Sequence, residues 1–254
     1  MSPGLSVLIT ARDEAEMLPG AIESVAGWAD EIVVVVDPRT TDATPDIASA
    51  AGARVLDHAF ESSAAQCNWG LTECVSPWVL VLDADERVTP ELRDEISARL
   101  ARPGSAAYSV RRVNFALGRH LRWGDWGADR VVRLLASGHA RFGERAVHGA
   151  VEAESVGDLR SALEHHTLRS LGQYLPKLDD YASRGAADLL AARCRSSLTR
   201  ACLHANWRLF RGLVLRLGIL DGRAGVLVAV LGAWGTFLKW VRAWEATTTA
   251  TSRP

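Results

Sequence analysis

The chain has 254 residues, of which 48% are hydrophobic and 23% charged, with a formal net charge of −1. This size and composition allow one large domain with an appendage and a full buried core, and the near-neutral charge argues against nucleic acid as the main partner. The four cysteines have no zinc-binding spacing, which favours reduced thiols in a cytoplasmic protein.

The first hundred residues alternate between predicted strands and helices. Short apolar runs predict strands at 5–10, 31–36, 54–56 and 78–82. Amphipathic stretches between them predict helices at 14–27, 42–51 and 62–74. Thr89 followed by Pro90 marks the start of a further helix. This alternation predicts a parallel sheet with right-handed crossovers.

The pattern changes after residue 104. Strands are predicted at 108–114, 131–135 and 139–142 without long helices between them. Residues 115–130 are rich in Gly and Trp and predict a long loop, which beside a sheet is often functional. From about residue 168 the chain is predicted to be helical.

The helical end combines basic and apolar segments. Residues 193–220 contain six arginines and no acid, and residues 224–238 are almost wholly apolar. The apolar run is short for a membrane span, which needs about 20 residues. A basic helical region that bears tryptophans suits the headgroup layer of an anionic membrane. The alternative is a helical hairpin that packs on the core or on a second subunit. The polar tail from Thr247 is expected to be disordered.

The run VLVLDADER, residues 79–87, predicts a ligand site. Asp83 and Asp85 follow an apolar strand directly, so they are expected where that strand leaves the sheet. Carboxylates two residues apart can point to one side of the chain and hold a hard divalent cation, which in turn can hold phosphates.

Two other acidic turns follow predicted strands. Asp37 ends the strand 31–36 and could accept hydrogen bonds from a nucleobase or a ribose, although a simple turn is the alternative. Asp42 is well explained as a helix cap. The segment 10–14 (TARDE) suits both a binding role and a helix N-terminus.

Taken together, the ordered motifs resemble a known family. TARDE, VVVVDPRTTDAT, AAQCNWGL, LDADERVTPEL, NFALGRHLRWGDW and HHTLRSLGQYLPKLDDYA resemble family 2 glycosyltransferases of the GT-A fold, particularly the bacterial lipopolysaccharide core β-glucosyltransferases and their relatives. The resemblance covers nearly the whole chain. It implies an α/β, Rossmann-like nucleotide-sugar-binding domain with a mixed, mainly parallel sheet at 1–165. A helical region at 166–246 and the tail 247–254 would follow.

The resemblance also implies an activity. The chain would be an inverting transferase that moves a sugar from a nucleotide-diphospho-sugar, with UDP-glucose as an example, assisted by Mn²⁺ or Mg²⁺. The metal would be held by Asp83, Asp85 and His148. His165 and His166 are weaker candidates as ligands. The nucleotide site would be lined by Thr10, Arg12, Glu14, Asp37, Gln66, Asn68, Asp83 and Ala84.

A single displacement also needs a general base for the acceptor hydroxyl. Asp129 matches the acid that follows the Trp-containing loop in the relatives and is preferred over Asp125. The alternative for Asp129 is a salt bridge to Arg130 or Arg133. Contacts with the acceptor or the sugar are assigned to Trp126, Arg133 and Asp125, and Trp123 could also stack on a sugar.

Three positions depart from the family pattern and put the donor sugar in doubt. Arg39 stands in the motif after the second strand, Cys67 replaces a common arginine, and Gly149 replaces a common glutamate. Arg39 could compensate for the missing cation at position 67. The changes also motivate a second hypothesis, a nucleotide-sugar- or membrane-binding protein without turnover.

The leading hypothesis is a transferase at the cytoplasmic face of the membrane. Its acceptor would be a glycolipid or an envelope glycan, and its C-terminal helices would contact the inner membrane peripherally or form a homodimer. The first residues, MSPGLSVLIT, lack the pattern of a secretory signal. A phosphatase of the haloacid dehalogenase type is disfavoured, because Arg87 stands where that family needs Thr or Ser.

Overall fold

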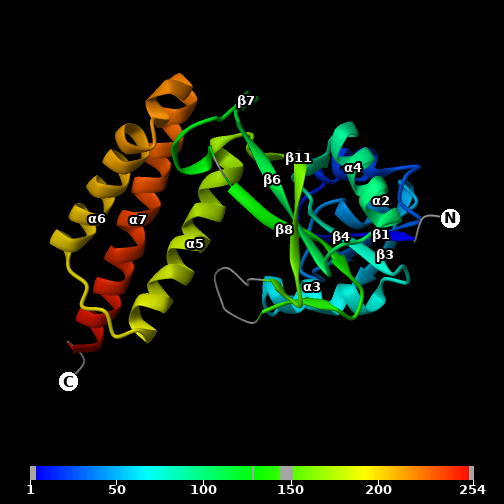
Figure 1. The fold of residues 1–254 in the computed structure, drawn as a ribbon. Helices are drawn as coiled ribbons and strands as arrows, with labels where there is room; N and C mark the ends of the chain where they lie inside the picture. Colours follow the sequence, from blue (N-terminus) through cyan, green and yellow to red (C-terminus); the bar gives the residue numbers. More distant parts are fainter. Residues whose placement is uncertain (1–3, 128, 144–150, 252–254) are drawn as a thin grey trace. The chain divides into compact units, whose positions relative to one another are not determined.

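The computed structural model describes residues 4–127, 129–143 and 151–251. The chain divides into two compact units (Figure 1). The first unit, called the sheet unit, comprises Met1–Arg112 and Asp129–His165. The second, called the helical unit, comprises Val113–Ala128 and His166–Pro254. The loop 113–128, which the sequence places with the catalytic domain, therefore groups with the C-terminal helices.

One mixed sheet runs in the order β3-β2-β1-β4-β8-β6-β11-β5. Its first four strands are parallel, and β8 joins β4 antiparallel. The mixed α/β sheet confirms the predicted fold class. The strand β7 pairs with β6, and β9 and β10 form a separate two-stranded sheet. The strands of both sheets are β1 (Leu5–Ala11), β2 (Glu31–Val36), β3 (Arg54–Asp57), β4 (Trp78–Asp83), β5 (Glu86–Val88), β6 (Ala107–Ala116), β7 (Arg119–His120), β8 (Asp129–Ala136), β9 (Ala140–Phe142), β10 (Val151–Ala153) and β11 (Val156–Leu168).

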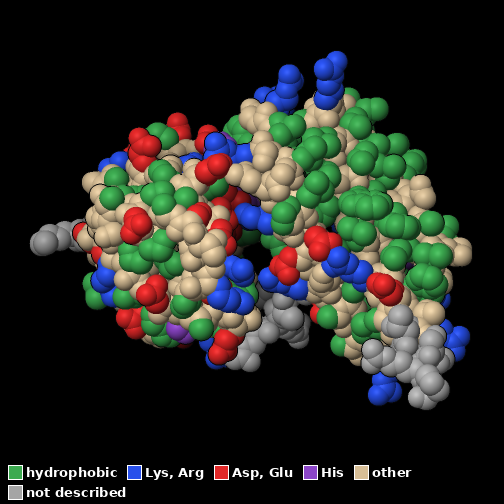
Figure 2. Space-filling model, turned by 180° about the vertical axis from the view of Figure 1, so that it is seen from behind, with side chains coloured by type: hydrophobic (Ala, Val, Ile, Leu, Met, Phe, Trp, Pro, Cys, Tyr) green, Lys and Arg blue, Asp and Glu red, His purple; other side chains and the backbone are tan. Residues whose placement is uncertain are grey.

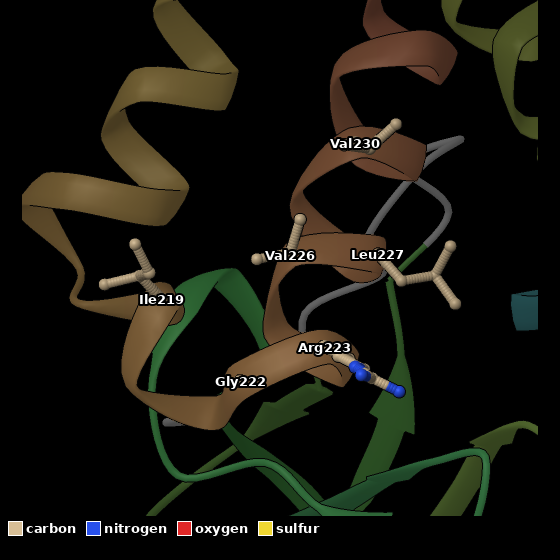
Figure 3. Close-up of a pocket in the computed structure, with 6 residues that line it drawn as sticks. All are labelled: Ile219, Gly222, Arg223, Val226, Leu227 and Val230. Atoms are coloured by element: carbon tan, nitrogen blue, oxygen red, sulfur yellow. The ribbon is translucent and has the colours of Figure 1, made fainter.

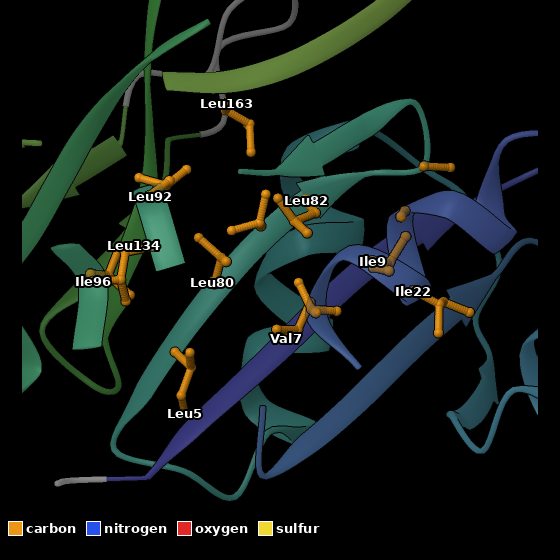
Figure 4. Close-up of a cluster of buried hydrophobic side chains, with 14 of the residues drawn as sticks. Leu5, Val7, Ile9, Ile22, Leu80, Leu82, Leu92, Ile96, Leu134 and Leu163 are labelled. Carbon is orange, nitrogen blue, oxygen red and sulfur yellow. The ribbon is translucent and has the colours of Figure 1, made fainter. Parts of the chain in front are cut away.

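Period-two alternation along the parallel strands builds two separate cores. In β1, Val7 and Ile9 face α1 (Leu18–Val25) and α4 (Pro90–Ala101), whereas Leu8 faces α3 (Ser63–Glu73). Figure 4 shows the first of these clusters, in which side chains from β1 and β4 meet those of both helices. The helix α3 lies so close to β1 that a Cβ atom at Gly70 would be 2.6 Å from the Leu8 side chain.

The helices between the strands are shorter than the sequence predicts. The predicted helix at 14–27 begins only at Leu18, because Asp13 adopts a left-handed φ of 52° and a turn follows it. The helix α2 (Thr44–Ala50) is likewise short. The predicted start of α4 is confirmed: the Thr89 side chain accepts a hydrogen bond from the Leu92 amide, and Pro90 follows.

The helical unit has its own small core. It contains β7, the short helix η1 (Gly124–Trp126), α5 (Leu171–Ala191), α6 (Leu198–Phe210), the π-turn η2 (Arg211–Leu215), η3 (Gly218–Asp221) and α7 (Gly222–Thr251). Leu121 and Leu168 pack with Leu178 of α5 and Val228 of α7. The helix α5 begins at Leu171 rather than near 168, because β11 continues to Leu168.

The helix α7 extends into the segment 247–254 that the sequence predicts as a disordered tail. It continues to Thr251, and residues 252–254 lie outside the described residues. The Thr247 and Thr248 hydroxyls donate to the Trp244 carbonyl, so both side chains satisfy their hydrogen bonds within the helix. The segment Gly218–Thr248 is also long and apolar enough to cross a membrane, although 33% of its most apolar window is buried inside the protein.

Candidate active site

The carboxyl ends of β1, β2 and β4 meet at one edge of the sheet. In register, Thr10 of β1 lies opposite both Val35 of β2 and Asp83 of β4. Because β1 lies between β2 and β4 while the chain order is 1, 2, 4, this edge is the switch point where open α/β sheets bind ligands. Thr10, Asp37 and Asp83 are therefore gathered as the sequence predicts.

Asp37 is buried at this edge and bound by arginine. The Arg39 amide and Nε each donate to Asp37 Oδ1 at 3.0 Å, and the Arg12 guanidinium lies 4.0 Å from its other oxygen. The Arg39 hydrogen bonds lower the pKa of Asp37 against the opposing effect of burial. Arg39 thus neutralises Asp37. Among the described residues, Arg39 makes no contact that supports the hypothesis that it compensates for the missing cation at position 67.

The loops after β1 and β2 are tied together by hydrogen bonds. The Thr44 hydroxyl accepts from the Glu14 amide at 2.9 Å, and Asp42 accepts from the Ala15 amide at 2.9 Å. Asp13 accepts from the Thr41 amide at 2.7 Å. Asp42 therefore ties the two loops together. The helix cap predicted at Asp42 is wrong, because the N-cap position of α2 is Ala43 and has no side-chain cap, although Asp42 accepts from the Thr44 amide at 2.9 Å.

The acidic motif forms a tight turn between β4 and β5. Ala84 and Asp85 occupy the turn, Ala84 is buried, and the Asp83 amide donates to Glu86 Oε2 at 3.0 Å. Arg87 closes the turn by donating to the Ala84 carbonyl at 3.0 Å. Asp83 is about half exposed at the end of its strand, and its side chain bonds Arg133.

A buried acid and two arginines support this turn. Glu86 is fully buried and accepts from Arg133 Nη2 at 2.6 Å and from Arg112 Nη1 at 3.4 Å. Burial raises the pKa of Glu86, while Arg133 opposes that shift. The guanidinium keeps its proton, because Asp83 and Glu86 raise the pKa of Arg133 although burial lowers it. Two arginines reach the same Glu86 oxygen, so their charges offset part of the cost of burying this carboxyl group.

Arg133 was assigned to the acceptor or sugar from the sequence, and the structure corrects this. Only 7% of the residue is exposed, and its guanidinium is used by Asp83 and Glu86. Within the described part of the chain, the Arg133 Nε is buried without a hydrogen-bond partner. Arg133 therefore orients the acidic turn from a buried position by bonding Asp83 and Glu86. No role was predicted for Glu86, which begins β5 three residues after β4 ends; the available signal was a third acid in the run DADE.

Asp129 opens β8 and is held by an arginine that the sequence did not suggest. Arg112 Nε, on the neighbouring strand β6, donates to Asp129 Oδ2 at 2.8 Å. The predicted alternatives, Arg130 and Arg133, bind elsewhere: Arg130 contacts Ser109 and Asp158, and Arg133 contacts the acidic turn. Asp129 remains about one-third exposed.

The α3 residues predicted for the nucleotide site are engaged with the protein. Gln66 bonds the His58 ring at 2.8 Å and the His58 carbonyl at 3.1 Å. Asn68 makes a reciprocal pair with the Phe142 amide and carbonyl, both at 2.8 Å. Burial raises the pKa of Cys67 to about 12, and the nearby Asp83 charge adds to that rise.

The loop candidates belong to the helical unit. Asp125, about 10% exposed, is surrounded by Arg208, Arg211 and Arg216 at 3.0 to 3.4 Å. Trp126 packs against Tyr174 with ring centroids 5.7 Å apart. Both residues therefore have structural roles, whereas Trp123 is 44% exposed.

Of the three histidines considered as ligands, one lies beside the acidic turn. His165 Nε2 is 3.5 Å from Asp85 Oδ2, although the sequence ranked it below His148. His166 stacks on Phe115 with centroids 4.9 Å apart. His148 and Gly149 lie outside the described residues.

These side chains fit a divalent cation that takes further ligands from its substrate. Among the described residues, no group of three or more His, Cys, Asp or Glu side chains is arranged to hold a metal alone. Mg²⁺ is commonly bound by only one or two carboxylates together with substrate phosphates and waters. Asp83 and Asp85 provide such carboxylates, and neither is fully buried.

Comparisons with known proteins agree with this architecture. The model of glycosyl transferase family 2 matches residues 6–154. An uncharacterized glycosyltransferase of Rickettsia bellii is 27% identical, covering 92% of this chain and 84% of that protein. A lipopolysaccharide core biosynthesis glycosyltransferase of Rhizobium meliloti is 26% identical, covering 92% and 89%.

Among solved structures, glucosyl-3-phosphoglycerate synthase from Mycobacterium tuberculosis has a TM-score of 0.38 and 21% identity, covering 44% of each chain. The family assignment does not depend on this likeness. The family model spans more than half of the chain, including all three strands whose carboxyl ends carry Thr10, Asp37 and Asp83. The chain therefore belongs to glycosyltransferase family 2.

Proposed function

We propose that the protein transfers a sugar from a UDP-sugar, for example UDP-glucose, to a glycolipid or envelope-glycan acceptor. The observation that carries this proposal is the meeting of Thr10, Asp37 and Asp83 at the switch point of the sheet. The lipopolysaccharide core biosynthesis enzyme of Rhizobium meliloti, similar over most of both chains, supports the acceptor class.

In the proposed donor site, the nucleoside lies at the ends of β1 and β2. Thr10, Arg12, Glu14 and Asp37 line it, with Asp83 and Ala84 on the side of β4. Arg39 adds a positive charge, and about half of its side-chain surface is exposed to solvent. Because Arg39 already occupies Asp37, nucleoside binding at that carboxylate requires the guanidinium to share it or to move aside. Gln66 and Asn68 act by holding the walls of this site.

A divalent cation, Mn²⁺ or Mg²⁺, would be held by Asp85 and Asp83 and would neutralise the charge of the leaving diphosphate. His165 lies next to Asp85, and His148 remains a further candidate ligand. The buried Glu86 and Arg133 fix the turn that carries both aspartates. The protein thus contributes the carboxylates of Asp83 and Asp85 in a fixed orientation.

Asp129 is proposed as the general base for inversion in a single displacement. Its ion pair with Arg112 orients one oxygen, while the side chain stays partly exposed for an acceptor hydroxyl. Arg112 also contacts Glu86, so the base and the acidic turn share one network.

The cellular setting is also proposed. The helical unit would bring the enzyme to the cytoplasmic face of the membrane as a peripheral protein, where a lipid-borne acceptor is available. The apolar segment of α7 and the basic stretch 193–220 support this setting.

The first test is thermal stabilisation by nucleotide sugars. Melting would be followed with UDP-, GDP-, ADP- and dTDP-sugars, with and without Mn²⁺. A ligand that binds only the folded state raises its stability by about 2.7 kcal/mol at one hundred times its Kd. We expect a UDP-sugar to stabilise the protein when metal is present and Asp85→Ala to abolish the effect. Asp94→Ala, at an exposed aspartate of α4, should keep it. The proposal fails if no nucleotide sugar stabilises the wild-type protein.

The second test separates binding from chemistry. Asp129→Asn should be stabilised by donor and metal as the wild type is, yet lose transfer by about 10²-fold or more. Asp158→Asn is the matched control, because Asp158 also pairs with an arginine, Arg130 of β8, but is exposed. Full activity in Asp129→Asn would exclude Asp129 as the base.

A further inference from the structure

The helical unit presents a group of large apolar side chains to solvent. They come from the end of α6, from η2 and from η3, and each is at least 47% exposed: Trp207, Phe210, Val214, Leu215, Ile219 and Leu220. Figure 2 shows hydrophobic side chains gathered over this unit. Apolar surfaces of this kind on a soluble unit mark contacts with a protein or a membrane.

Arginines stand between these apolar residues in the sequence. Arg208, Arg211 and Arg216 converge on Asp125, at 3.4, 3.0 and 3.1 Å, so three positive charges share one carboxylate. Among the described residues, the Nε of Arg211 is buried without a hydrogen-bond partner, and the Nε of Arg208 makes only the 3.4 Å ion-pair contact with Asp125. The cluster keeps an excess of two positive charges.

The neighbouring carboxylate does not remove this excess. Asp221 accepts hydrogen bonds from the backbone amides of Arg122 and Trp123, at 3.1 and 2.8 Å. It therefore fixes the loop of η1 against η3 rather than pairing with the arginines. Across residues 193–220 the chain has six arginines and no acid. Each guanidinium is a planar donor that suits phosphate oxygens.

A shallow groove continues the apolar surface along α7. It has a volume of about 510 Å³ and is lined by Ile219, Gly222, Arg223, Val226, Leu227 and Val230 (Figure 3). Arg223 is the charged residue in this otherwise apolar lining. The pairing of apolar side chains with an arginine thus recurs on the adjoining helix.

The helix α7 is partly covered by its own unit. Val228 and Leu231 are buried in the core shared with Leu178 of α5. If α7 crossed a bilayer in this conformation, the face that carries Val228 and Leu231 would still pack against protein. A helix that lies in the headgroup layer needs only one apolar face. The exposed residues Val226, Val230 and Trp234 provide such a face.

We propose that Arg208, Arg211 and Arg216 form a binding site for the phosphates of an anionic phospholipid surface. The six exposed apolar residues beside them enter the acyl boundary; together these nine residues are the docking surface. Charge complementarity favours an anionic membrane, because the segment 207–220 carries an excess of positive charge together with exposed apolar side chains. This inference rests on the proposed membrane contact, names the surface that makes it, and does not depend on the transfer reaction.

The test measures flotation of the full-length protein with vesicles. Vesicles of phosphatidylcholine alone are compared with vesicles that also contain phosphatidylglycerol. We expect binding to the anionic vesicles, release at high salt and weak binding to neutral ones. Arg211→Gln/Arg216→Gln should weaken binding roughly 20-fold, since an arginine near an anionic surface contributes about fivefold. This variant leaves Arg208 to pair with Asp125. Phe210→Ser/Leu220→Ser should weaken binding about tenfold or more.

The matched control is Arg102→Gln/Arg160→Gln, which makes the same charge change at exposed positions of the sheet unit and should bind as the wild type does. Unchanged melting temperatures show that the variants fold. Donor stabilisation by a UDP-sugar is measured in parallel, so a failed transferase proposal and a failed docking proposal are distinguished.

Three outcomes would overturn the proposal. The first is equal vesicle binding by the wild type and both docking-surface variants. The second is resistance of the bound protein to high salt and alkaline extraction, which would indicate a spanning α7. The third is that the wild-type protein binds no vesicles but forms a dimer, and that Phe210→Ser/Leu220→Ser makes it monomeric. This result would assign the surface to a second copy of the chain.

Discussion

Asp37 shows how a single buried carboxylate depends on its neighbours. Only 2% of the residue is exposed, yet it is an acceptor for three donor atoms of Arg39. These hydrogen bonds hold the pKa of Asp37 below its ordinary value of 3.8, although burial opposes them. Since the folded pKa is the lower one, ionised Asp37 stabilises the fold above pH 3.8. That contribution disappears as the pH falls through the folded value.

Replacing this residue should therefore change the acid stability of the protein. Asp37→Asn cannot take up a proton, so its unfolding free energy should decline less steeply below pH 3.8 than that of the wild type. Urea unfolding at a series of pH values between neutral and acid measures the slope. Asp94→Asn, at an exposed position of α4, should keep the wild-type slope. Equal slopes for Asp37→Asn and wild type would contradict the assignment.

At the scale of elements, Thr89 links a helix to a strand. Its side chain accepts from the Leu92 amide at 3.2 Å and so caps α4, while its hydroxyl donates to the Ala162 carbonyl of β11 at 3.1 Å. The cap was predictable from the Thr-Pro dipeptide, but its bond to β11 was not. The N-terminus of α4 is thereby fixed to a strand more than seventy residues later.

Thr89→Ala removes both bonds. We expect a loss of about 1–2 kcal/mol in unfolding free energy, the usual range for a threonine cap. Chemical denaturation of the two proteins measures the difference. Thr72→Ala is the matched control: Thr72 is exposed in α3 and bonds only the carbonyl of Trp69 three residues earlier, so its loss should stay within about 0.5 kcal/mol. Equal losses for the two variants would show that Thr89 has no special role.

The elements also show which parts of the fold a sequence discloses. The run EIVVVV predicted β2 with its observed bounds, because the five consecutive β-branched residues after Glu31 leave little ambiguity. The thirteen-residue β11, VGDLRSALEHHTL, was not predicted. Its polar residues interrupt any apolar run, and fully buried positions such as Leu159 and Leu163 are four residues apart. The sequence therefore carries neither a clean strand period nor a clean helix period in this region.

The sequence predicted which strand ends form the site, but not which side chains form ion pairs there. Strand ends placed Thr10, Asp37 and Asp83 correctly, because parallel strands share one carboxyl edge. The ion pairs of Asp129 with Arg112 and of Asp83 with Arg133 depend on the antiparallel register of β6, β8 and β4. That register is set by tertiary packing and leaves no mark in the local sequence.

At the scale of the whole molecule, the four cysteines divide between the two units. Cys67 and Cys74 are buried on α3 and at its end, in the sheet unit, whereas Cys194 and Cys202 are exposed in the helical unit. Burial raises the pKa of both Cys67 and Cys74 to about 12. Since the thiolate is the reactive form, burial and pKa both protect these two residues.

Thiol labelling should therefore report on each unit separately. In native protein at pH 8, iodoacetamide should label Cys194 and Cys202 and leave the other two unmodified. All four should react in denaturant. Peptide mass spectrometry after increasing urea gives the unfolding of the sheet unit from Cys67 and Cys74. Rapid native labelling of Cys67 would contradict the packing of α3 against β1.

The network beneath the acidic turn has a consequence for the order of assembly during synthesis. The acidic residue Glu86 leaves the ribosome before its two partners, Arg112 and Arg133, which lie 26 and 47 residues later. Enclosing an unpaired carboxylate costs several kcal/mol, so a nascent chain that ends before β8 has reason to keep this turn in water. The four parallel strands can already pair at that stage. The part of the enzyme proposed to hold the metal would therefore close last, once the arginines of the second half have been made.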